Sequence, residues 1–171
     1  DKKILQALSD AGAGLSIQEH QIEIRPLPLK AFHFDATDCP DLFPPLVALA
    51  AYCEGTTVIE GVSRLQHKES NRAMSLQSEF AKLGVSVQLQ DDLMIVKGMR
   101  EGNSLRPLTA VTVHSHHDHR IAMAFAIAGL FAEGVTEIED IECISTSYPN
   151  FAEHLDLFLS APKTQEDRID V

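Results

Sequence analysis

Two stretches of this 171-residue chain repeat the same succession of a helix, a glycine and a short strand. Residues 46–60 and 125–139 each run from small apolar residues through a glutamate and a glycine into a β-branched segment; the glycines are Gly55 and Gly134. Glycine adopts the left-handed conformation that ends a helix at little cost. Each copy is therefore predicted to hold a helix that stops at its glycine, and repeated units of this kind pack around a shared core.

A second pair of segments, residues 4–15 and 76–87, has a related organisation around Gly12 and Gly84. Each begins with the apolar spacing of a helix and ends with the alternation of a strand. Hairpins are expected to follow, the first between residues 15–17 and 22–24 and the second turning at Asp91-Asp92. In order, the chain reads as roughly βαβαββ units with a period of the order of 70 residues, which places it in the α/β class.

About two and a half such units account for residues 1–160, which we interpret as part of one domain. A last helix is expected over residues 147–159. The polar segment 161–171 is predicted to be a disordered tail. Residues 99–108, which include Gly102 and Pro107, are predicted to form a surface loop.

The charge balance excludes several classes of partner. With 14 Lys and Arg against 25 Asp and Glu, the formal net charge is −11. The chain therefore has no basic face for a nucleic acid or an anionic membrane, and no apolar run approaches the ~18 residues of a membrane span. Three cysteines without CxxC spacing argue against a disulfide framework and favour a reducing, cytoplasmic location. An anionic ligand would have to be held by a few local cations.

The first segment whose residues could take part in catalysis is Asp38-Cys39-Pro40-Asp41-Leu42-Phe43-Pro44-Pro45. Proline is tolerated in the first turn of a helix, so Asp41 is expected just before a helix or at its start. It could simply cap that helix. Alternatively, it is a carboxylate at a strand-to-helix junction that can act as a general base.

The second segment is His67-Lys68-Glu69-Ser70-Asn71-Arg72, where a helix is expected to begin near Ser70. A helix N-terminus disfavours cations, so Arg72 in the first turn is unexpected unless an anion lies between the amide groups and the guanidinium. The alternative is a solvated charge cluster with Ser70 as the cap.

The third segment is His114-Ser115-His116-His117-Asp118-His119-Arg120, again with an aspartate at a helix start and an arginine in the first turn. If the preceding strand continues, His114 and His116 share a face and His117 does not. HExxH spacing and nearby cysteines are both missing. Solvated or supporting histidines are therefore favoured over a metal site.

Four motifs together make the chain similar to a known family. Pro40-Asp41, Lys68-Glu69-Ser70-Asn71-Arg72, Asp118-His119-Arg120-Ile121-Ala122-Met123 and Tyr148-Pro149-Asn150-Phe151 resemble, in order and spacing, the C-terminal portion of the 5-enolpyruvylshikimate-3-phosphate synthase family, the 3-phosphoshikimate 1-carboxyvinyltransferases. Members have two domains, each of three βαβαββ units. The resemblance implies that this chain is most of one domain, without its first unit and without the partner domain.

The resemblance also implies a reaction. Phosphoenolpyruvate donates its enolpyruvyl group to the 5-hydroxyl of shikimate 3-phosphate through a tetrahedral intermediate, with release of phosphate and without a metal or organic cofactor. Asp41 matches the carboxylate that accepts the hydroxyl proton, and Glu69 matches the carboxylate that exchanges a proton at the methylene carbon. His119 matches a neighbouring active-site histidine. Asn71 stands where members usually carry aspartate.

The matching substrate-binding residues are mostly cationic. Lys68 matches a lysine on the shikimate side, and Arg72 and Arg120 match arginines that bind phosphoenolpyruvate. Arg64 stands where some members place an asparagine for the shikimate phosphate. Thr146 stands where a lysine for phosphoenolpyruvate is expected, and a neutral hydroxyl does not replace that cation.

Three other functions compete with this one. The sister enzyme of the same fold transfers enolpyruvyl to UDP-N-acetylglucosamine, although the Lys-Glu-Ser-Asn-Arg and Asp-His-Arg motifs favour the shikimate family. Thr146 favours a non-catalytic anion-binding homologue, and the histidines leave a metal-binding domain as the third alternative. Because half of a two-domain cleft is expected to be missing, the chain alone is predicted to be inactive.

Overall fold

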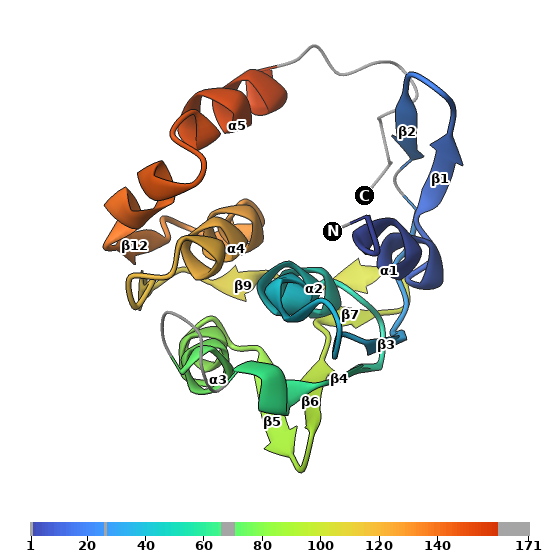
Figure 1. Cartoon of the computed structure of the whole chain (residues 1–171), viewed down its shortest axis with the longest axis horizontal. Helices are drawn as coiled ribbons and strands as arrows, with labels where there is room; N and C mark the ends of the chain where they lie inside the picture. The colour runs from blue at the N-terminus through green and yellow to red at the C-terminus, as the bar shows by residue number, and fades with distance from the viewer. Residues whose placement is uncertain (1, 26, 66–70, 161–171) are drawn as a thin grey trace.

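The computed structural model describes residues 2–25, 27–65 and 71–160 and contains two parallel β–α–β units (Figure 1). In the first, β3 (His33–Asp35) leads through the 3-10 turn η1 (Pro40–Leu42) into α2 (Phe43–Ala51), and β4 (Thr56–Glu60) returns parallel to β3. α2 ends at Ala51, four residues before the predicted stop at Gly55, and Gly55 has a φ of 96° in the turn that leads into β4.

The second unit repeats the first. β10 (Thr112–His114) leads into α4 (His119–Gly129), and β12 (Glu137–Glu139) lies parallel to β10. A short parallel pair, β9 (Leu108–Thr109) with β11 (Ala132–Glu133), flanks the same helix. The predicted internal repeat is thus confirmed as two β–α–β units.

The segments between these units follow the second repeat. A 3-10 turn, η2 (Val62–Leu65), precedes α3 (Arg72–Lys82), which is followed by the antiparallel strands β5 (Ser86–Gln90) and β6 (Leu93–Lys97). The main sheet has the order β3-β4-β6-β5, and β6 is antiparallel to β4. Asp91 has a φ of 53° in the tight turn between β5 and β6, where a hairpin was predicted.

The N-terminal part resembles this arrangement, with α1 (Ile4–Asp10) followed by the antiparallel hairpin of β1 (Gly14–Ile17) and β2 (Ile22–Arg25). In Figure 1, α2 lies near the centre of the view, with α1, α3 and α4 around it and the strands of the main sheet along one side. α2 packs against α4, and both carry small residues where they meet. The core accordingly includes buried residues from both helices: Leu46, Val47, Ala50, Ala51, Ile121, Ala124, Phe125 and Ala128.

The prediction of a surface loop over residues 99–108 is wrong. The segment forms the hairpin of β7 (Arg100–Glu101) and β8 (Ser104–Leu105) and then enters β9. Met99 and Leu108 are buried, and the Met99 N–H donates to the Ala51 carbonyl (2.8 Å) at the end of α2. The glycine in this segment therefore marks a hairpin turn whose ends are fixed by apolar burial.

The C-terminal part contains a 3-10 segment, η3 (Ile141–Thr146), and then α5 (Phe151–Ser160). The last helix thus begins at Phe151, four residues later than the expected start. The segment 161–171, predicted to be a disordered tail, lies outside the described residues. In the part of the chain that the structure describes, no helix is long and apolar enough to cross a membrane.

Cys39, Cys53 and Cys143 are all free. Burial raises the pKa of the Cys53 thiol to about 12 and also raises the pKa values of Cys39 and Cys143. Because the thiolate is the reactive form, these side chains are poor nucleophiles.

Candidate active site

Asp41 lies in η1, between the end of β3 and the start of α2, where the sequence placed it. Pro44 and Pro45 occupy the first turn of α2, where a missing N–H costs no hydrogen bond. The alternative of a capping aspartate is wrong, because the N-cap residue of α2 is Leu42 and no side chain caps the helix. The Asp41 carboxylate points instead to two arginines.

Arg72, the first residue of α3, is fully buried, and its guanidinium meets two carboxylates. Its Nε donates to Asp118 Oδ2 at 2.7 Å, and its Nη1 donates to Asp41 Oδ1 at 2.8 Å. The N-cap of the helix is Asn71, whose side chain accepts from the Met74 N–H (3.4 Å), and Ser70, the expected cap, lies outside the described residues. The sequence predicted an anion beside Arg72, and the chain itself supplies two.

Asp118 is a site residue that the sequence analysis did not select. It is fully buried at the N-cap of α4, where its Oδ1 accepts hydrogen bonds from the N–H groups of Arg120 (3.0 Å) and Ile121 (3.4 Å). The partial positive charge of the helix start and the Arg72 guanidinium together stabilise this carboxylate. Its position at the same strand-to-helix junction as Asp41 was the signal that could have revealed it.

Arg120 completes a line of alternating charges, with its Nη2 3.3 Å from Asp41 Oδ2. The line runs Asp118–Arg72–Asp41–Arg120. The side chains of Asp118 and Arg72 are fully buried, whereas those of Asp41 and Arg120 are 33% and 35% exposed. The exposed end therefore offers a carboxylate and a cation that a small anionic ligand can reach.

The other predicted residues lie on neighbouring elements. His119 is half-buried in the first turn of α4; Arg64 is exposed in η2, which contacts η1; and Thr146 is exposed at the end of η3, which packs against α4. The Thr146 hydroxyl donates to the Cys143 carbonyl at 2.7 Å. Within residues 2–25, 27–65 and 71–160, no hydrogen bond or ion pair joins Arg64 or Thr146 to the charged line. Lys68 and Glu69 lie outside the described residues.

The histidine-rich segment does not continue β10 as an extended strand. β10 ends at His114, and His116 and His117 have φ values of 56° and 59°, so the backbone turns. His117 Nδ1 lies 2.6 Å from Asp140 Oδ2, and His116 Nε2 lies 3.3 Å from Glu79 Oε1. Among the described residues, no group of three or more His, Cys, Asp and Glu side chains is arranged to hold a metal ion. These histidines support the loop that leads into α4.

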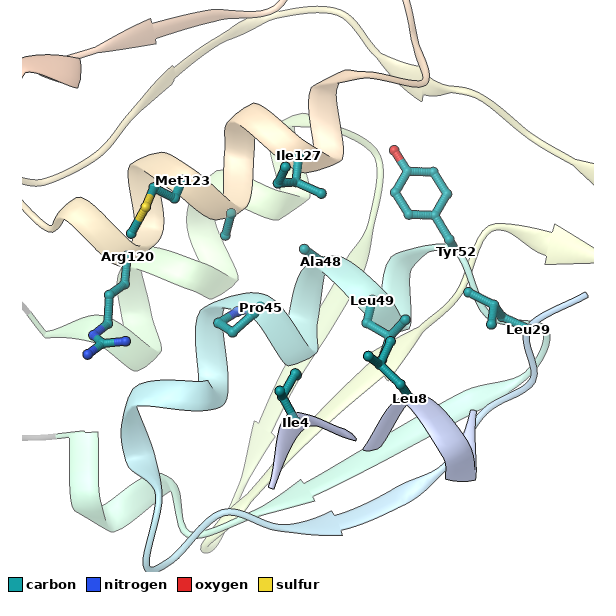
Figure 2. Close-up of a pocket in the computed structure, with 11 residues that line it drawn as sticks. Ile4, Leu8, Leu29, Pro45, Ala48, Leu49, Tyr52, Arg120, Met123 and Ile127 are labelled. Carbon is teal, nitrogen blue, oxygen red and sulfur yellow. The ribbon is translucent and has the colours of Figure 1, made fainter. Parts of the chain in front are cut away.

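A separate apolar cavity of about 450 Å³ lies between α1, α2 and α4 (Figure 2). Its lining includes Ile4, Pro45, Leu49 and Ile127, and Figure 2 shows Arg120 at one end, remote from Tyr52. Apart from Arg120, its walls are apolar and offer little to a phosphate or a carboxylate. The charged line beside it is therefore the candidate site for an anionic ligand.

The family model of EPSP synthase (3-phosphoshikimate 1-carboxyvinyltransferase) matches residues 1–155. This chain belongs to the EPSP synthase family. Among similar proteins, the 3-phosphoshikimate 1-carboxyvinyltransferase of Shouchella clausii is 40% identical over 164 residues, covering 89% of this chain and 37% of the relative. That of Methanococcus maripaludis is 32% identical over 156 residues, covering 91% and 35%.

Solved structures agree with this assignment. The EPSP synthase of Acinetobacter baumannii superposes with a TM-score of 0.82 at 30% identity, over 90% of this chain and 38% of that one. The enolpyruvyl transferase NikO of Streptomyces tendae has a TM-score of 0.67 at 23% identity, over 93% and 35%, and supports the fold alone. The predicted α/β fold of this family is confirmed. The chain spans about a third of the length of the curated relatives that it matches.

Proposed function

We propose that this chain is part of a cytoplasmic 3-phosphoshikimate 1-carboxyvinyltransferase. In this reaction the 5-hydroxyl oxygen of shikimate 3-phosphate forms a bond to C2 of phosphoenolpyruvate while the methylene carbon gains a proton. Phosphate then leaves as a methyl proton is lost, which restores the enolpyruvyl double bond. Membership of the EPSP synthase family is the observation that carries this proposal.

Asp41 is the proposed base for the hydroxyl proton. Its side chain is one-third exposed at the outer end of the charged line, so a substrate hydroxyl can reach it. Arg72 holds it at 2.8 Å from the buried side, which fixes the carboxylate in one place. Asp118 in turn fixes Arg72 at 2.7 Å.

Arg120 is proposed to change partners when phosphoenolpyruvate binds. Its contact with Asp41 is the longest in the line at 3.3 Å and is partly exposed, so a phosphate or carboxylate can replace Asp41 as its partner. Asp41 would then exchange this contact for one with the substrate hydroxyl, whose proton it is proposed to accept.

The remaining roles rest on the resemblance to the family. Lys68 and Arg64 are proposed to bind shikimate 3-phosphate, Glu69 to exchange a proton at the methylene carbon, and His119 to assist beside Arg120. Thr146, at the position of an expected lysine, contributes a hydroxyl on the phosphoenolpyruvate side. The relatives from Methanococcus maripaludis and Shouchella clausii are both named 3-phosphoshikimate 1-carboxyvinyltransferase, which disfavours UDP-N-acetylglucosamine as the acceptor.

The test is phosphate release from phosphoenolpyruvate by a protein that contains this chain together with the partner domain. Shikimate 3-phosphate and UDP-N-acetylglucosamine are compared as acceptors, with Asp41→Asn as the variant and Asp38→Asn, an exposed neighbour, as the matched control. We expect release with shikimate 3-phosphate only, lost in the Asp41 variant and kept in the control. Release with UDP-N-acetylglucosamine only would support the sister activity, and release with neither acceptor would support a non-catalytic homologue.

A further inference from the structure

Glu79 is a buried carboxylate that takes no part in the charged line. It lies on α3, its side chain is 5% exposed, and it is surrounded by donors. Its Oε2 accepts from Lys82 Nζ at 2.7 Å and from the His114 N–H at 2.9 Å, while its Oε1 lies 3.3 Å from His116 Nε2. Burial acts to raise the pKa of Glu79, but these donors outweigh it and hold the pKa below its ordinary value.

The two histidine contacts join α3 to the segment that leads into α4. His114 is the last residue of β10, and His116 lies in the left-handed turn that follows, with its N–H donating to His114 Nδ1 at 2.8 Å. The opposite side of this turn is attached to β12, because the Ser115 N–H donates to the Glu139 carbonyl at 3.2 Å. The turn is thus fixed between α3 and β12.

Arg72 and Glu79 contact the same segment from the same helix. They are seven residues apart on α3, which places them on one face at an axial separation of about 10 Å. Arg72 reaches Asp118 at the end of the 114–118 turn, and Glu79 reaches its beginning. The position of α3 relative to this turn is therefore defined at two points.

We infer that Glu79 is a positioning residue for the proposed active site, acting through His114 and His116 to hold the 114–118 turn where Asp118 meets Arg72. A role for Glu79 in catalysis depends on the proposed function. Its structural content is independent of any substrate: without the Glu79 contacts, the turn can move along α3 and the 2.7 Å bond from Arg72 Nε to Asp118 Oδ2 loosens.

The Nε–H of Arg72 reports on this directly, since it donates to Asp118 in the interior. Its hydrogen exchange can be followed by nitrogen–proton correlation spectroscopy of the chain, without substrate. Glu79→Ala removes both carboxylate oxygens that accept these hydrogen bonds. We therefore expect the protection of this Nε–H from exchange to fall at least about tenfold, which corresponds to a closed state less stable by about 1.4 kcal/mol. Glu79→Gln keeps an acceptor for the His114 N–H and should restore part of the protection.

Two controls separate positioning from general destabilisation. Lys82→Gln removes the exposed partner of Glu79 but keeps the turn contacts, so Arg72 protection should stay near that of the unmodified chain. Gly98→Ala strains a distant contact with the end of α2 and serves as a destabilised reference. The two variants are compared at denaturant concentrations that give them equal global stability. If the Arg72 Nε–H is then protected from exchange in Glu79→Ala at least as well as in Gly98→Ala, the inference is overturned. Because no activity is measured, failure here is distinct from failure of the proposed reaction.

Discussion

Replacement of Asp118 by asparagine removes one negative charge from the interior while leaving the shape of the side chain almost unchanged. Asparagine is a good N-cap residue, so the hydrogen bond from the Arg120 N–H can persist. The Arg72 guanidinium, however, loses its fully buried partner at 2.7 Å and remains fully buried itself. The substitution therefore isolates the effect of a buried charge.

Removal of one partner from a buried ion pair costs about 3–5 kcal/mol. Asp41 stays 2.8 Å from Arg72, so we expect the lower end, a loss of about 3 kcal/mol in the free energy of unfolding. For a chain of this size that lowers Tm by about 6–12 °C. Urea titration followed by far-ultraviolet circular dichroism, together with thermal melts, gives both quantities.

The matched control is Glu60→Gln, which removes a carboxylate 2.5 Å from His33 in a pair whose side chains are 63% and 42% exposed. Because exposed pairs contribute little, we expect a change of about 0.5 kcal/mol or less. In the double variant Arg72→Met with Asp118→Asn, the loss should be smaller than the sum of the single losses, since no buried guanidinium remains. A loss below about 1 kcal/mol in Asp118→Asn alone would refute this account of the buried pair.

Three further outcomes are expected. In Gly98→Ala the new Cβ would lie 1.9 Å from the Cys53 carbonyl oxygen, so urea titration should show a loss of about 3 kcal/mol in the free energy of unfolding. In Gly102→Ala the new Cβ meets nothing within 4 Å, and the loss should be about 1 kcal/mol. Because the pKa of Glu79 is lowered on folding, its ionised form stabilises the chain above the unfolded pKa. Glu79→Gln should therefore cost about 2 kcal/mol at pH 7, and the difference should close as pH falls through the lowered pKa of the folded state. Thr146→Lys should tighten phosphoenolpyruvate binding about tenfold by calorimetry, because it adds a cation at an exposed position beside α4.

Each of these three has an outcome that contradicts it. Equal losses in the two glycine variants would mean that the backbone around Cys53 can move aside. A Glu79→Gln difference that grows as pH falls would reverse the assigned direction of the pKa shift. Equal tightening in Ser145→Lys, at the neighbouring exposed position, would show that any added cation suffices and that position 146 is not special.

Local patterns in the sequence were enough to predict the repeated units and the place of Asp41. Pro44 and Pro45 lie in the first turn of α2, so the start of that helix was predicted from residues close to it. Its end was predicted less well, because α2 stops at Ala51 and the positive φ of Gly55 falls four residues later, just before β4. These effects depend on the conformational preferences of single residues and hold in almost any tertiary setting.

The ion pair between Arg72 and Asp118 could not be predicted from local sequence patterns. The two residues are 46 positions apart, and their contact depends on how α3 packs beside the second β–α–β unit. Similarly, β10 ends at His114 because His116 and His117 adopt left-handed conformations, which are uncommon for residues other than glycine and are not encoded by a local pattern here. The 99–108 segment was misread because burial of Met99 and Leu108 outweighs its turn-forming residues.

The equivalence of the two β–α–β units has a consequence for how such a site can arise. Asp41 and Asp118 occupy the same junction in the two copies, so duplication of an ancestral gene segment would have produced a facing pair of carboxylates in one event. A single arginine from the intervening helix then makes the two copies unequal, with one aspartate buried and the other open to solvent. Each β–α–β unit contributes only one of the two aspartates to the site. A polypeptide cut at the β7–β8 hairpin would divide the aspartates between two pieces, and complementation between those pieces would be required to rebuild it.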